Sequence, residues 1–506
     1  MLIVGDLYFL AMVNFMSHGK SGGGKRPGGK QPIKLGRKPR SSSKAKKPLN
    51  LDFSDVPKRT SLRSQTPEIH ARPKQRLGEF TIDRLSHDGR GLTQWNGKTL
   101  FIEGALPGEQ VSARFVSEHG RYAEAVIDQI IVSDEARQLP PCPHYSLCGG
   151  CQLQHMPAAM QLDFKQEAVL EQLQRWAGLA PRQLLPAISS RTNGYRSRAR
   201  LGVWYEDDGS ITLGFRQRQS KKLTAINHCL VLEPKLNPLL APLQAWLGQL
   251  QSAKAVTHIE LIGAGEKAGV IIRHIKRLTA ADRQGLEALA QNFHCEIWLQ
   301  GNTGAQLTDI NGEMCDPRLA YSLSADLTLG FHPQDFIQVN ADVNQQMVQQ
   351  ALQLLGLTGT ERVLDLFCGI GNFTLPLARA CAEVTGIEAV ESMVERGREN
   401  AAKLGLTNAR FMAADLAKLS VHQIQQRCGE VDAILLDPPR DGAREILSNI
   451  KQLAAHKIVY VSCNPATLAR DAKVLAESGY VLESLTILDM FPHTAHVESM
   501  ALFLRS

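Results

Sequence analysis

The sequence predicts an α/β and β protein: a doubly wound α/β domain in its C-terminal part, a small β-barrel near its N-terminal part, and a mixed α/β region between them. From about residue 331 onwards, strand-like runs such as VLDLFC, EVTGIE, AILLDPP and KIVYVSC alternate with helix-like segments. This alternation is typical of βαβ units in a largely parallel sheet. Between Leu77 and Val132, short β-rich segments are separated by Gly and Asn-Gly turns, which predicts a small barrel of the OB type.

The chain has 506 residues, which is enough for several domains. We expect a basic extension at 1–70, the barrel at 71–132, a central region at 133–330 and the doubly wound domain at 331–506. The tract from Lys20 to Lys47 has many Lys and Arg, no acidic residue, and frequent Gly, Ser and Pro, so we expect the extension to be disordered. Clustered cations favour a nucleic-acid partner, although a solubilising tail would have the same composition.

The first fifteen residues, MLIVGDLYFLAMVNF, resemble the apolar part of a secretory signal only superficially. They lack a basic start, Asp6 interrupts them, and no small-residue cleavage site follows. We therefore expect translation to begin at Met12 or Met16. No apolar run reaches the roughly 18–20 residues that span a bilayer, so we expect a cytoplasmic protein with no membrane partner, and reduced cysteines.

A strand, a glycine loop and a helix are predicted in VLDLFCGIGNFTLPLA, residues 363–378. Gly369 and Gly371 allow a tight turn and a close approach of a ligand to the backbone. No third glycine follows at the spacing of the dinucleotide fingerprint. Glu388 ends the next predicted strand, where a carboxylate can accept hydrogen bonds from both hydroxyls of a ribose. The pattern favours S-adenosylmethionine over a nicotinamide dinucleotide, and plain tight packing remains the simpler alternative.

Two further strands end in reactive groups. AILLDPPRDG carries Asp437 before two prolines, with Arg440 where methyltransferases that act on exocyclic amines have an aromatic residue. KIVYVSC ends in Cys463. A thiolate that adds to C6 of a uracil makes C5 nucleophilic enough to accept a methyl group, and it can leave again afterwards. Taken alone, Cys463 could equally be an inert buried thiol, and the prolines could simply end a strand.

The chemistry also needs a base that removes the C5 proton, so that the cysteine can be expelled. Glu498, in MFPHTAHVESMALF, begins the last predicted strand, and His493 and His496 lie in the loop before it. The combination of cofactor loop, thiol and late glutamate therefore predicts methylation of a pyrimidine carbon.

A cysteine-rich segment follows the predicted barrel. Cys142, Cys148 and Cys151 have the spacing C-x5-C-x2-C, and Cys229 is a plausible distant fourth ligand. Four thiolates suit either an iron–sulfur cluster or a zinc ion, and the spacing alone does not separate the two. A redox-active cysteine pair is disfavoured because no thioredoxin-like strand and helix surround it.

SCNPATLARD, HTAHVESM, LDLFCGIGNFTLPLA and the Asp-Pro-Pro strand resemble the RNA uracil-5-methyltransferase family over nearly the whole chain after residue 71. The resemblance implies a Rossmann-like class I methyltransferase domain, with Cys463 as the nucleophile and Glu498 as the proton-abstracting base. It implies cofactor contacts from Gln338, Phe367, Asn372, Glu388, Asp415 and Asp437. Ala495 stands where close relatives have Gly, and we expect its methyl group to be tolerated.

One branch of that family combines an N-terminal TRAM barrel with a [4Fe–4S] cluster on C-x5-C-x2-C and a distant cysteine. Resemblance to this branch implies a cluster on Cys142, Cys148, Cys151 and Cys229. It implies that the partner is 23S ribosomal RNA, with C5 of uridine 1939 as the target.

We expect a monomer that binds RNA in part through Arg196, Arg198 and Arg200, although these could instead pair with local acids. The alternative functions are methylation of transfer RNA or of another ribosomal uridine, a catalytically silent RNA-binding protein, and an iron–sulfur redox enzyme.

Overall fold

The computed structural model describes residues 76–302, 304 and 306–506. The basic extension predicted at 1–70 lies outside the described residues, so its expected disorder stays a prediction. In the described part, no helix is both long and apolar enough to cross a membrane.

The first sheet occupies most of the region predicted to be a small barrel. Its strands follow the order β1-β5-β6-β4-β3-β2, and β4 pairs with β6 in parallel while the other pairs are antiparallel. Alternate side chains such as Leu100 and Ile102 are buried, as expected for strands with one face on a core. The bounds are β1 Arg76–Thr81, β2 Arg84–Leu85, β3 Gly91–Trp95, β4 Lys98–Glu103, β5 Gln110–Glu118 and β6 Tyr122–Val132.

A helix follows the cysteine-rich segment. It comprises α1 (Ala158–Gln172) and one turn of π-helix, η2 (Leu173–Ala177). Leu173 is buried, whereas Trp176 is 59 % exposed. Gln161 and Lys165 are also buried although both are polar, which becomes important at the site.

The central region forms an eight-stranded sheet in the order β10-β9-β8-β11-β12-β13-β14-β15. Leu201, Ile259 and Ile272 face one side and pack with residues of α2 and α3, so this face is covered by helices. The strand bounds are β8 Arg198–Tyr205, β9 Ile211–Arg216, β10 Leu223–Ala225, β11 Val256–Ala264, β12 Lys267–His274, β13 Cys295–Gln300, β14 Leu307–Thr308 and β15 Met314–Cys315. The helices are η3 Asn237–Leu239, α2 Leu240–Gly248 and α3 Ala280–Phe293, and a hairpin of β16 (Leu319–Ser324) and β17 (Leu327–Phe331) follows.

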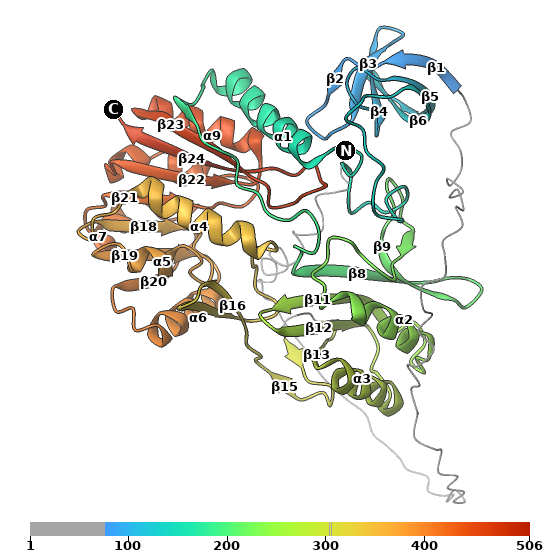
Figure 1. Ribbon diagram of the computed structural model, residues 1–506. Helices are drawn as coiled ribbons and strands as arrows, with labels where there is room; N and C mark the ends of the chain where they lie inside the picture. The colour runs from blue at the N-terminus through green and yellow to red at the C-terminus, as the bar shows by residue number, and fades with distance from the viewer. Residues whose placement is uncertain (1–75, 303, 305) are drawn as a thin grey trace, which may run out of the picture. The chain divides into compact units, whose positions relative to one another are not determined.

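The C-terminal region contains the predicted doubly wound sheet. Its order is β20-β19-β18-β21-β22-β24-β23-β7, which can be followed by the labels of Figure 1. Strands β20, β19, β18, β21 and β22 pair in parallel with their neighbours. Strand β24 pairs antiparallel with both β22 and β23. The bounds are β7 Gln183–Leu184, β18 Arg362–Leu366, β19 Glu383–Glu388, β20 Ala409–Ala413, β21 Ala433–Leu436, β22 Lys457–Ser462, β23 Tyr480–Leu488 and β24 Glu498–Arg505.

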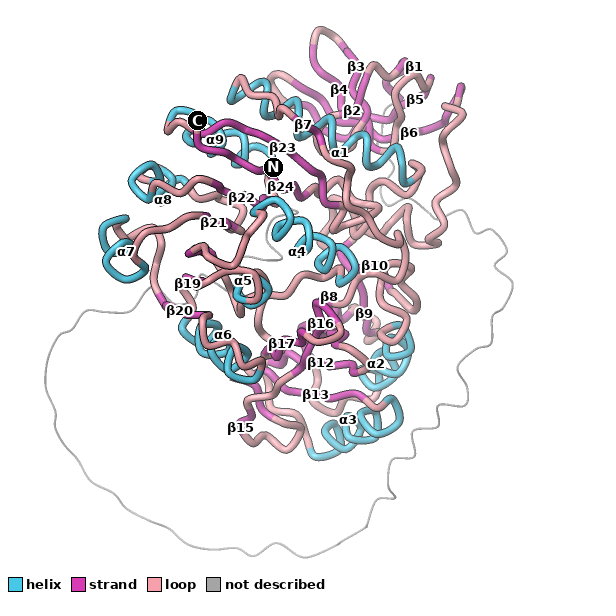
Figure 2. Tube along the Cα trace, turned by 60° about the vertical axis from the view of Figure 1, so that its left-hand side comes forward, coloured by secondary structure: helices cyan, strands magenta, loops and turns pink. Residues whose placement is uncertain are grey.

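Helices cover both faces of this sheet, which explains why its central strands are continuous apolar runs. On β22, Ile458 and Tyr460 pack with residues of α7, α8 and α9, whereas Val459 and Val461 pack with residues of α4 and α5. Figure 2 shows the helices flanking the strands. The helices are α4 Ala341–Leu355, α5 Thr374–Ala378, α6 Glu391–Lys403, α7 Val421–Cys428, α8 Arg444–Leu447, η4 Ile450–Leu453 and α9 Pro465–Glu477.

Candidate active site

The carboxyl ends of the parallel strands bring most of the predicted site residues to one edge of the sheet. Leu366, at the end of β18, is in register with Ile387 of β19 and with Leu436 of β21. The residues that follow these three positions are Phe367, Glu388 and Asp437. They therefore lie side by side at the edge where open α/β sheets bind their ligands.

The glycine loop after β18 has the backbone shape expected of a ligand-binding turn. Phe367 has a φ of 66°, which is unusual for a residue with a side chain and is found where function constrains the backbone. Gly371 has a φ of 97°, and a Cβ there would lie 2.9 Å from a ring carbon of Phe411. The Asn372 side chain exchanges hydrogen bonds with Asn344 at 2.9 and 3.0 Å and accepts one from the Tyr321 hydroxyl at 2.9 Å.

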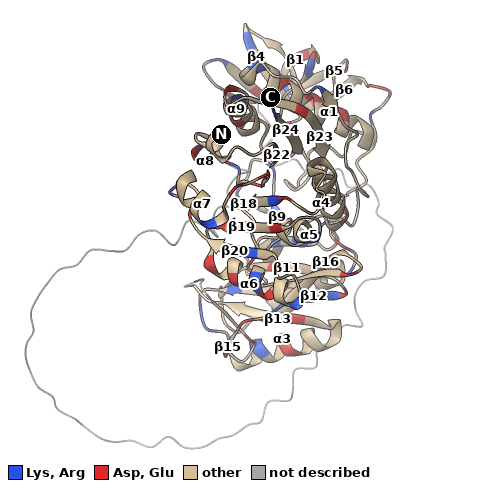
Figure 3. Cartoon of the chain, turned by 90° about the vertical axis from the view of Figure 1, so that its left-hand side faces the viewer, with Lys and Arg blue, Asp and Glu red and all other residues tan. Residues whose placement is uncertain are grey.

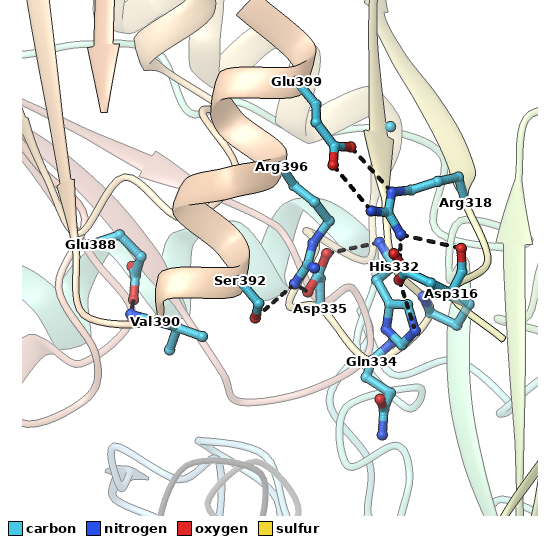
Figure 4. Close-up of polar contacts among 12 residues, drawn as sticks. Asp316, Arg318, His332, Gln334, Asp335, Glu388, Val390, Ser392, Arg396 and Glu399 are labelled. Atoms are coloured by element: carbon cyan, nitrogen blue, oxygen red, sulfur yellow. Dashed lines mark hydrogen bonds and ion pairs between the residues drawn. The ribbon is translucent and has the colours of Figure 1, made fainter. Parts of the chain in front are cut away.

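Glu388 ends β19 and is fixed by its own backbone surroundings. Its Oε1 accepts hydrogen bonds from the amide of Val390 at 3.0 Å (Figure 4) and from that of Ala389 at 2.8 Å. Its Oε2 accepts one from the Gly369 amide at 3.3 Å. The carboxylate is thus held between the glycine loop and the start of α6, with lone pairs left for a ligand.

Asp415 lies two residues beyond the end of β20. It forms an ion pair with Lys418 at 2.8 Å and accepts a hydrogen bond from the Ala417 amide at 3.0 Å. These contacts hold the pKa of its carboxyl below the usual range. Asp415 is therefore near the predicted edge but is largely engaged locally.

Gln338 lies on the loop between β17 and α4, which is anchored by a buried polar network. Arg396 of α6 pairs with Asp335, and Asp335 also accepts a hydrogen bond from the His332 amide at 2.8 Å (Figure 4). Arg198 of the central sheet donates to the Asp335 carbonyl at 2.6 Å. The network ties the Gln338 loop to the helix that follows Glu388.

Cys463 and Glu498 lie opposite each other at the ends of two neighbouring strands. Strands β22 and β24 pair antiparallel, and the last pair of their ladder is Ser462 with Ser499. The next position along β22 is Cys463, and its counterpart on β24 is Glu498. Directly opposed residues of an antiparallel pair have Cβ atoms roughly 4.5–5.5 Å apart, so the thiol and the carboxyl lie close to each other.

The turn after Cys463 is fixed by the motif that carries it. Asn464 caps α9, with its side chain accepting from the Ala466 amide at 3.1 Å, and Pro465 occupies the first helical position, where its missing N–H costs nothing. The Asn464 side chain also donates to the carbonyl of Arg440 at 3.1 Å. The loop that follows Cys463 and the Asp-Pro-Pro-Arg loop are thereby held together.

The electrostatics of this corner are those of a desolvated, acid-rich site. Burial raises the pKa of Glu498 to about 8, with a further rise from Asp437 and opposing effects from Arg440 and Lys165. Burial raises the pKa of Asp437 to about 7. Burial, followed by the charges of Glu498 and Asp437, raises the pKa of the Cys463 thiol to about 12, while Arg440 lowers it. Oε2 of Glu498 is buried and has no hydrogen-bond partner among the described residues.

Two residues of the site were missed by the sequence analysis. Asp365, inside the apolar run of β18, is fully buried, accepts a hydrogen bond from the Thr374 hydroxyl at 2.5 Å, and has a pKa raised to about 7 by burial. A carboxylate within a buried strand was the available signal. Lys165 of α1 contacts the loop before Glu498. The sequence signal for it was a lysine on the buried face of a helix, four residues from both Gln161 and Val169.

The structure brings the distant Cys229 together with the cysteine-rich segment. Burial raises the pKa of the Cys151 thiol to about 12, and the charges of Cys229, Cys148 and Cys142 raise it further, so the four groups act on one another. All four are free thiols of intermediate exposure. Among the described residues, no set of three or more His, Cys, Asp or Glu side chains has the arrangement that would hold a metal ion.

Comparison with known proteins assigns the chain to a family. The model of the tRNA (Uracil-5-)-methyltransferase family matches residues 158–506. The chain belongs to this family. It is therefore a methyltransferase of the uracil-5 type that uses S-adenosylmethionine, as the glycine loop and the Cys463–Glu498 pair led us to expect.

Curated relatives cover most of the chain. The 23S rRNA (uracil(1939)-C(5))-methyltransferase RlmD of Pseudomonas aeruginosa (strain UCBPP-PA14) is 44% identical over 439 residues, which are 86% of this chain and 95% of the relative. The protein of the same name from Aeromonas hydrophila is 44% identical over 441 residues, which are 87% of this chain and 98% of the relative.

A solved structure shares the fold. The tRNA (uracil-54, C5)-methyltransferase of Pyrococcus abyssi, crystallised with S-adenosyl-L-homocysteine, has a TM-score of 0.65 and 24% sequence identity, and the match covers 84% of this chain and 100% of that one. This similarity confirms a Rossmann-like methyltransferase domain.

Proposed function

We propose that this protein methylates C5 of uridine 1939 in 23S ribosomal RNA, the reaction that the names of its curated relatives state. The observation that carries the proposal is the register of β22 and β24, which places the Cys463 thiol opposite the Glu498 carboxyl at the ligand-binding edge of the sheet. A silent RNA-binding protein would have no need of a nucleophile and a base held in this way.

The reaction requires two acts from these side chains. The Cys463 thiol first loses its proton to solvent; the resulting thiolate bonds to C6 of the uracil, and the electron pair of the C5–C6 double bond moves toward C5 and the ring carbonyl. When bound, S-adenosylmethionine supplies the electrophilic methyl group that C5 accepts. Glu498 then takes the proton from C5, the double bond re-forms, and the sulfur of Cys463 leaves.

The residues at the edge suit a positively charged cofactor. Glu388, Asp437 and the buried Asp365 are carboxylates around the glycine loop, and the pKa values of Asp365 and Asp437 are raised by burial. A cation bound beside them would offset their mutual repulsion and favour ionisation of Cys463. The predicted cofactor contacts, Gln338, Phe367, Asn372, Glu388, Asp415 and Asp437, remain part of this proposal.

RNA is proposed to bind the part of the central sheet around Glu260, on the face opposite α2 and α3; farther along that face, Ile262 and Ile271 pack with residues of the hairpin β16–β17. The single carboxylate of Glu260 lies 3.2 Å from Arg198, 2.8 Å from Arg273 and 3.8 Å from Arg200, so this surface has an excess of positive charge. Trp204, on the same strand as Arg200 and at even spacing from it, is 46% exposed and offers a ring on which a base can stack. Figure 3 draws Lys and Arg in blue, and a blue segment lies beside the label of β12, the strand that carries Arg273.

The predicted contacts of Arg196 and Arg198 need revision in this light. Arg198 donates to the carbonyls of Asp335 and Pro333 and pairs with Glu260, so its guanidinium has internal partners. The guanidinium of Arg196 lies 5.8 Å from the centre of the Phe491 ring. Their direct contact with RNA stays a prediction, and Arg200, Arg273 and Trp204 are better placed to make it.

The wider architecture is proposed from the resemblance described above. The six-stranded sheet would be a TRAM barrel within 71–132, the central iron–sulfur region would span 133–330, and the methyltransferase domain 331–506. The protein would act as a cytoplasmic monomer. Cys142, Cys148, Cys151 and Cys229 would hold the [4Fe–4S] cluster, because four thiols that raise one another's pKa are a donor set of the right kind and number. Iron and acid-labile sulfide in the purified protein, both lost in Cys148→Ser, would support this assignment.

Methyl transfer to defined RNAs tests the proposed function. The protein is incubated with S-adenosylmethionine carrying a tritiated methyl group and with either a 23S rRNA transcript or a tRNA transcript, and the modified nucleotide is mapped by mass spectrometry. We expect 5-methyluridine at position 1939 of the rRNA. Labelling of the tRNA alone would overturn the rRNA assignment and favour the substrate of the P. abyssi protein.

A further inference from the structure

Lys165 is a fully buried lysine whose partners lie in the loop that carries the proposed base. Its ammonium donates to Oδ1 of Asp489 at 2.6 Å and to the carbonyl of Phe491 at 3.0 Å. Its side chain is 0% exposed and that of Asp489 is 5% exposed. Asp489 directly follows β23, and Glu498 begins β24. The ammonium therefore binds the loop that connects these two strands.

Gln161, one helical turn before Lys165, holds the same loop. Its Oε1 accepts a hydrogen bond from the His493 amide at 2.8 Å, and its Nε2 donates to the carbonyls of Met156 and Leu153. His493 is buried with a φ of 66°, a backbone conformation that persists only where surrounding contacts enforce it. Helix α1 therefore presents two buried polar side chains to one strained loop.

Burying a charged amine costs free energy unless the amine is paired. Apolar side chains often stabilise a core as well as a buried ion pair does, so a buried lysine points to a role other than stability. We propose that Lys165 is a positioning residue for Glu498: it fixes the loop that presents this carboxyl and supplies the positive charge that keeps the carboxyl able to accept the C5 proton. The inference rests on the proposed function, because it assumes that Glu498 is the base.

The charges around Glu498 make the effect of Lys165 specific. Asp437 beyond β21 and Cys463 beyond β22 disfavour a second negative charge in this corner, whereas Lys165 and the exposed Arg440 favour it. The other titratable groups of the loop are Asp489, His493 and His496. Without the ammonium, the pKa of Glu498 would rise above its already raised value near 8, because fewer cations would oppose the burial.

The test compares the full-length protein with Lys165→Met, which keeps the length of the side chain and removes its charge. With RNA containing 5-fluorouridine, addition and methyl transfer proceed but no proton can be removed, so both proteins should trap the RNA at similar rates. With ordinary RNA at about pH 7, the variant should hold its covalent adduct several-fold longer than the wild type, because a smaller fraction of Glu498 is ionised. Raising the pH to about 9 should shorten that lifetime.

Lys457→Met is the matched control. Lys457 donates to the Leu355 carbonyl at 2.7 Å from the start of β22, at the opposite end of that strand from Cys463. Its adduct lifetime should equal that of the wild type. If Lys165→Met fails to fold, Lys165→Met combined with Asp489→Leu replaces both buried charges by apolar groups, and the same slow, pH-dependent release is expected.

The outcomes separate this inference from the function on which it rests. A folded variant that releases ordinary RNA at the wild-type rate, or with a defect that higher pH does not relieve, would overturn the role of Lys165 alone. A wild-type protein that does not trap 5-fluorouridine RNA would instead remove the proposed function.

Discussion

The half of the site proposed to bind the cofactor and the half proposed to react are built in contrasting ways. In the cofactor half, both oxygens of Glu388 accept backbone hydrogen bonds, Asn372 exchanges hydrogen bonds with Asn344, and Asp415 is paired with Lys418. In the nucleophile half, Glu498 keeps a buried oxygen without a partner among the described residues, and Cys463 has a pKa raised to about 12 by burial and by neighbouring carboxylates.

The contrast shows how binding groups differ from reacting groups. A side chain that binds is useful when its orientation is already fixed, because less ordering remains to be done on association. A side chain that accepts a proton is useful when its pKa lies near the working pH, as the raised pKa of Glu498 near 8 does. We therefore expect substitutions in the nucleophile half to abolish turnover, and those in the cofactor half to weaken binding.

The largest effect should come from Cys463→Ala. Without the sulfur, C5 of the uracil is not activated, and we expect turnover to fall by at least about a thousandfold, as is common when a nucleophile is removed. S-adenosylmethionine should bind as before. Cys428→Ala, which removes a buried thiol from α7, one of the helices on one face of the same sheet, should remain active. Methyl incorporation into RNA measures the activity of both variants. An active Cys463→Ala protein would refute the role of Cys463 as the nucleophile.

Glu498→Gln should stop the reaction one step later. We expect it to form the covalent adduct with ordinary RNA but to lose about 10²–10⁴-fold in turnover, the usual contribution of a positioned base. For the wild type, the carboxyl must be ionised to accept a proton, so release should accelerate as the pH rises through the pKa of about 8. Gel electrophoresis under denaturing conditions follows the adduct. Normal release by the variant, or release in the wild type that slows with rising pH, would exclude Glu498 as the base.

In the cofactor half, Glu388→Gln and Asp415→Asn should differ from each other. Glu388 is buried and aimed at the glycine loop, so loss of its charge should weaken cofactor affinity by about 10–100-fold, the equivalent of a charged hydrogen bond. Asp415 is already paired with Lys418, so its substitution should weaken affinity less. Isothermal titration with S-adenosylhomocysteine measures both, and equal losses would mean that Asp415 contacts the cofactor as strongly as Glu388 does.

The smallest effect should be on RNA binding. Trp204→Ala removes one exposed ring, and we expect RNA affinity to fall by about tenfold, the lower part of the range for a stacked base, with cofactor affinity unchanged. Fluorescence anisotropy with a labelled rRNA fragment checks this. An unchanged affinity would show that the sheet surface around Trp204 does not bind RNA.

The sequence predicted more of the cofactor half than of the nucleophile half. Glu388 and Asp437 follow strands of a regular alternation, so the topology alone placed them at one edge. Cys463 and Glu498 were recognised by motif, but their proximity depends on the antiparallel return of β24 and on its register, which no local pattern specified.

The contacts that helix α1 makes with the loop before Glu498 were beyond sequence reasoning. Lys165 and Asp489 are separated by 324 positions, and Gln161 and His493 by 332. The same holds for the hydrogen bond from Tyr321 to Asn372. Ala495, noted as a departure from close relatives, packs with Leu153, Met156 and Phe164 in a small apolar cluster, so its methyl group is accommodated as expected.

The bond between Cys463 and the uracil ring can be located directly. The wild-type protein is incubated with S-adenosylmethionine and RNA containing 5-fluorouridine, digested with protease and nuclease, and analysed by tandem mass spectrometry. The account predicts a methylated fluorouridine attached to the sulfur of Cys463. A nucleotide attached to any other residue, or the absence of a covalent product under conditions in which ordinary RNA is methylated, would contradict it.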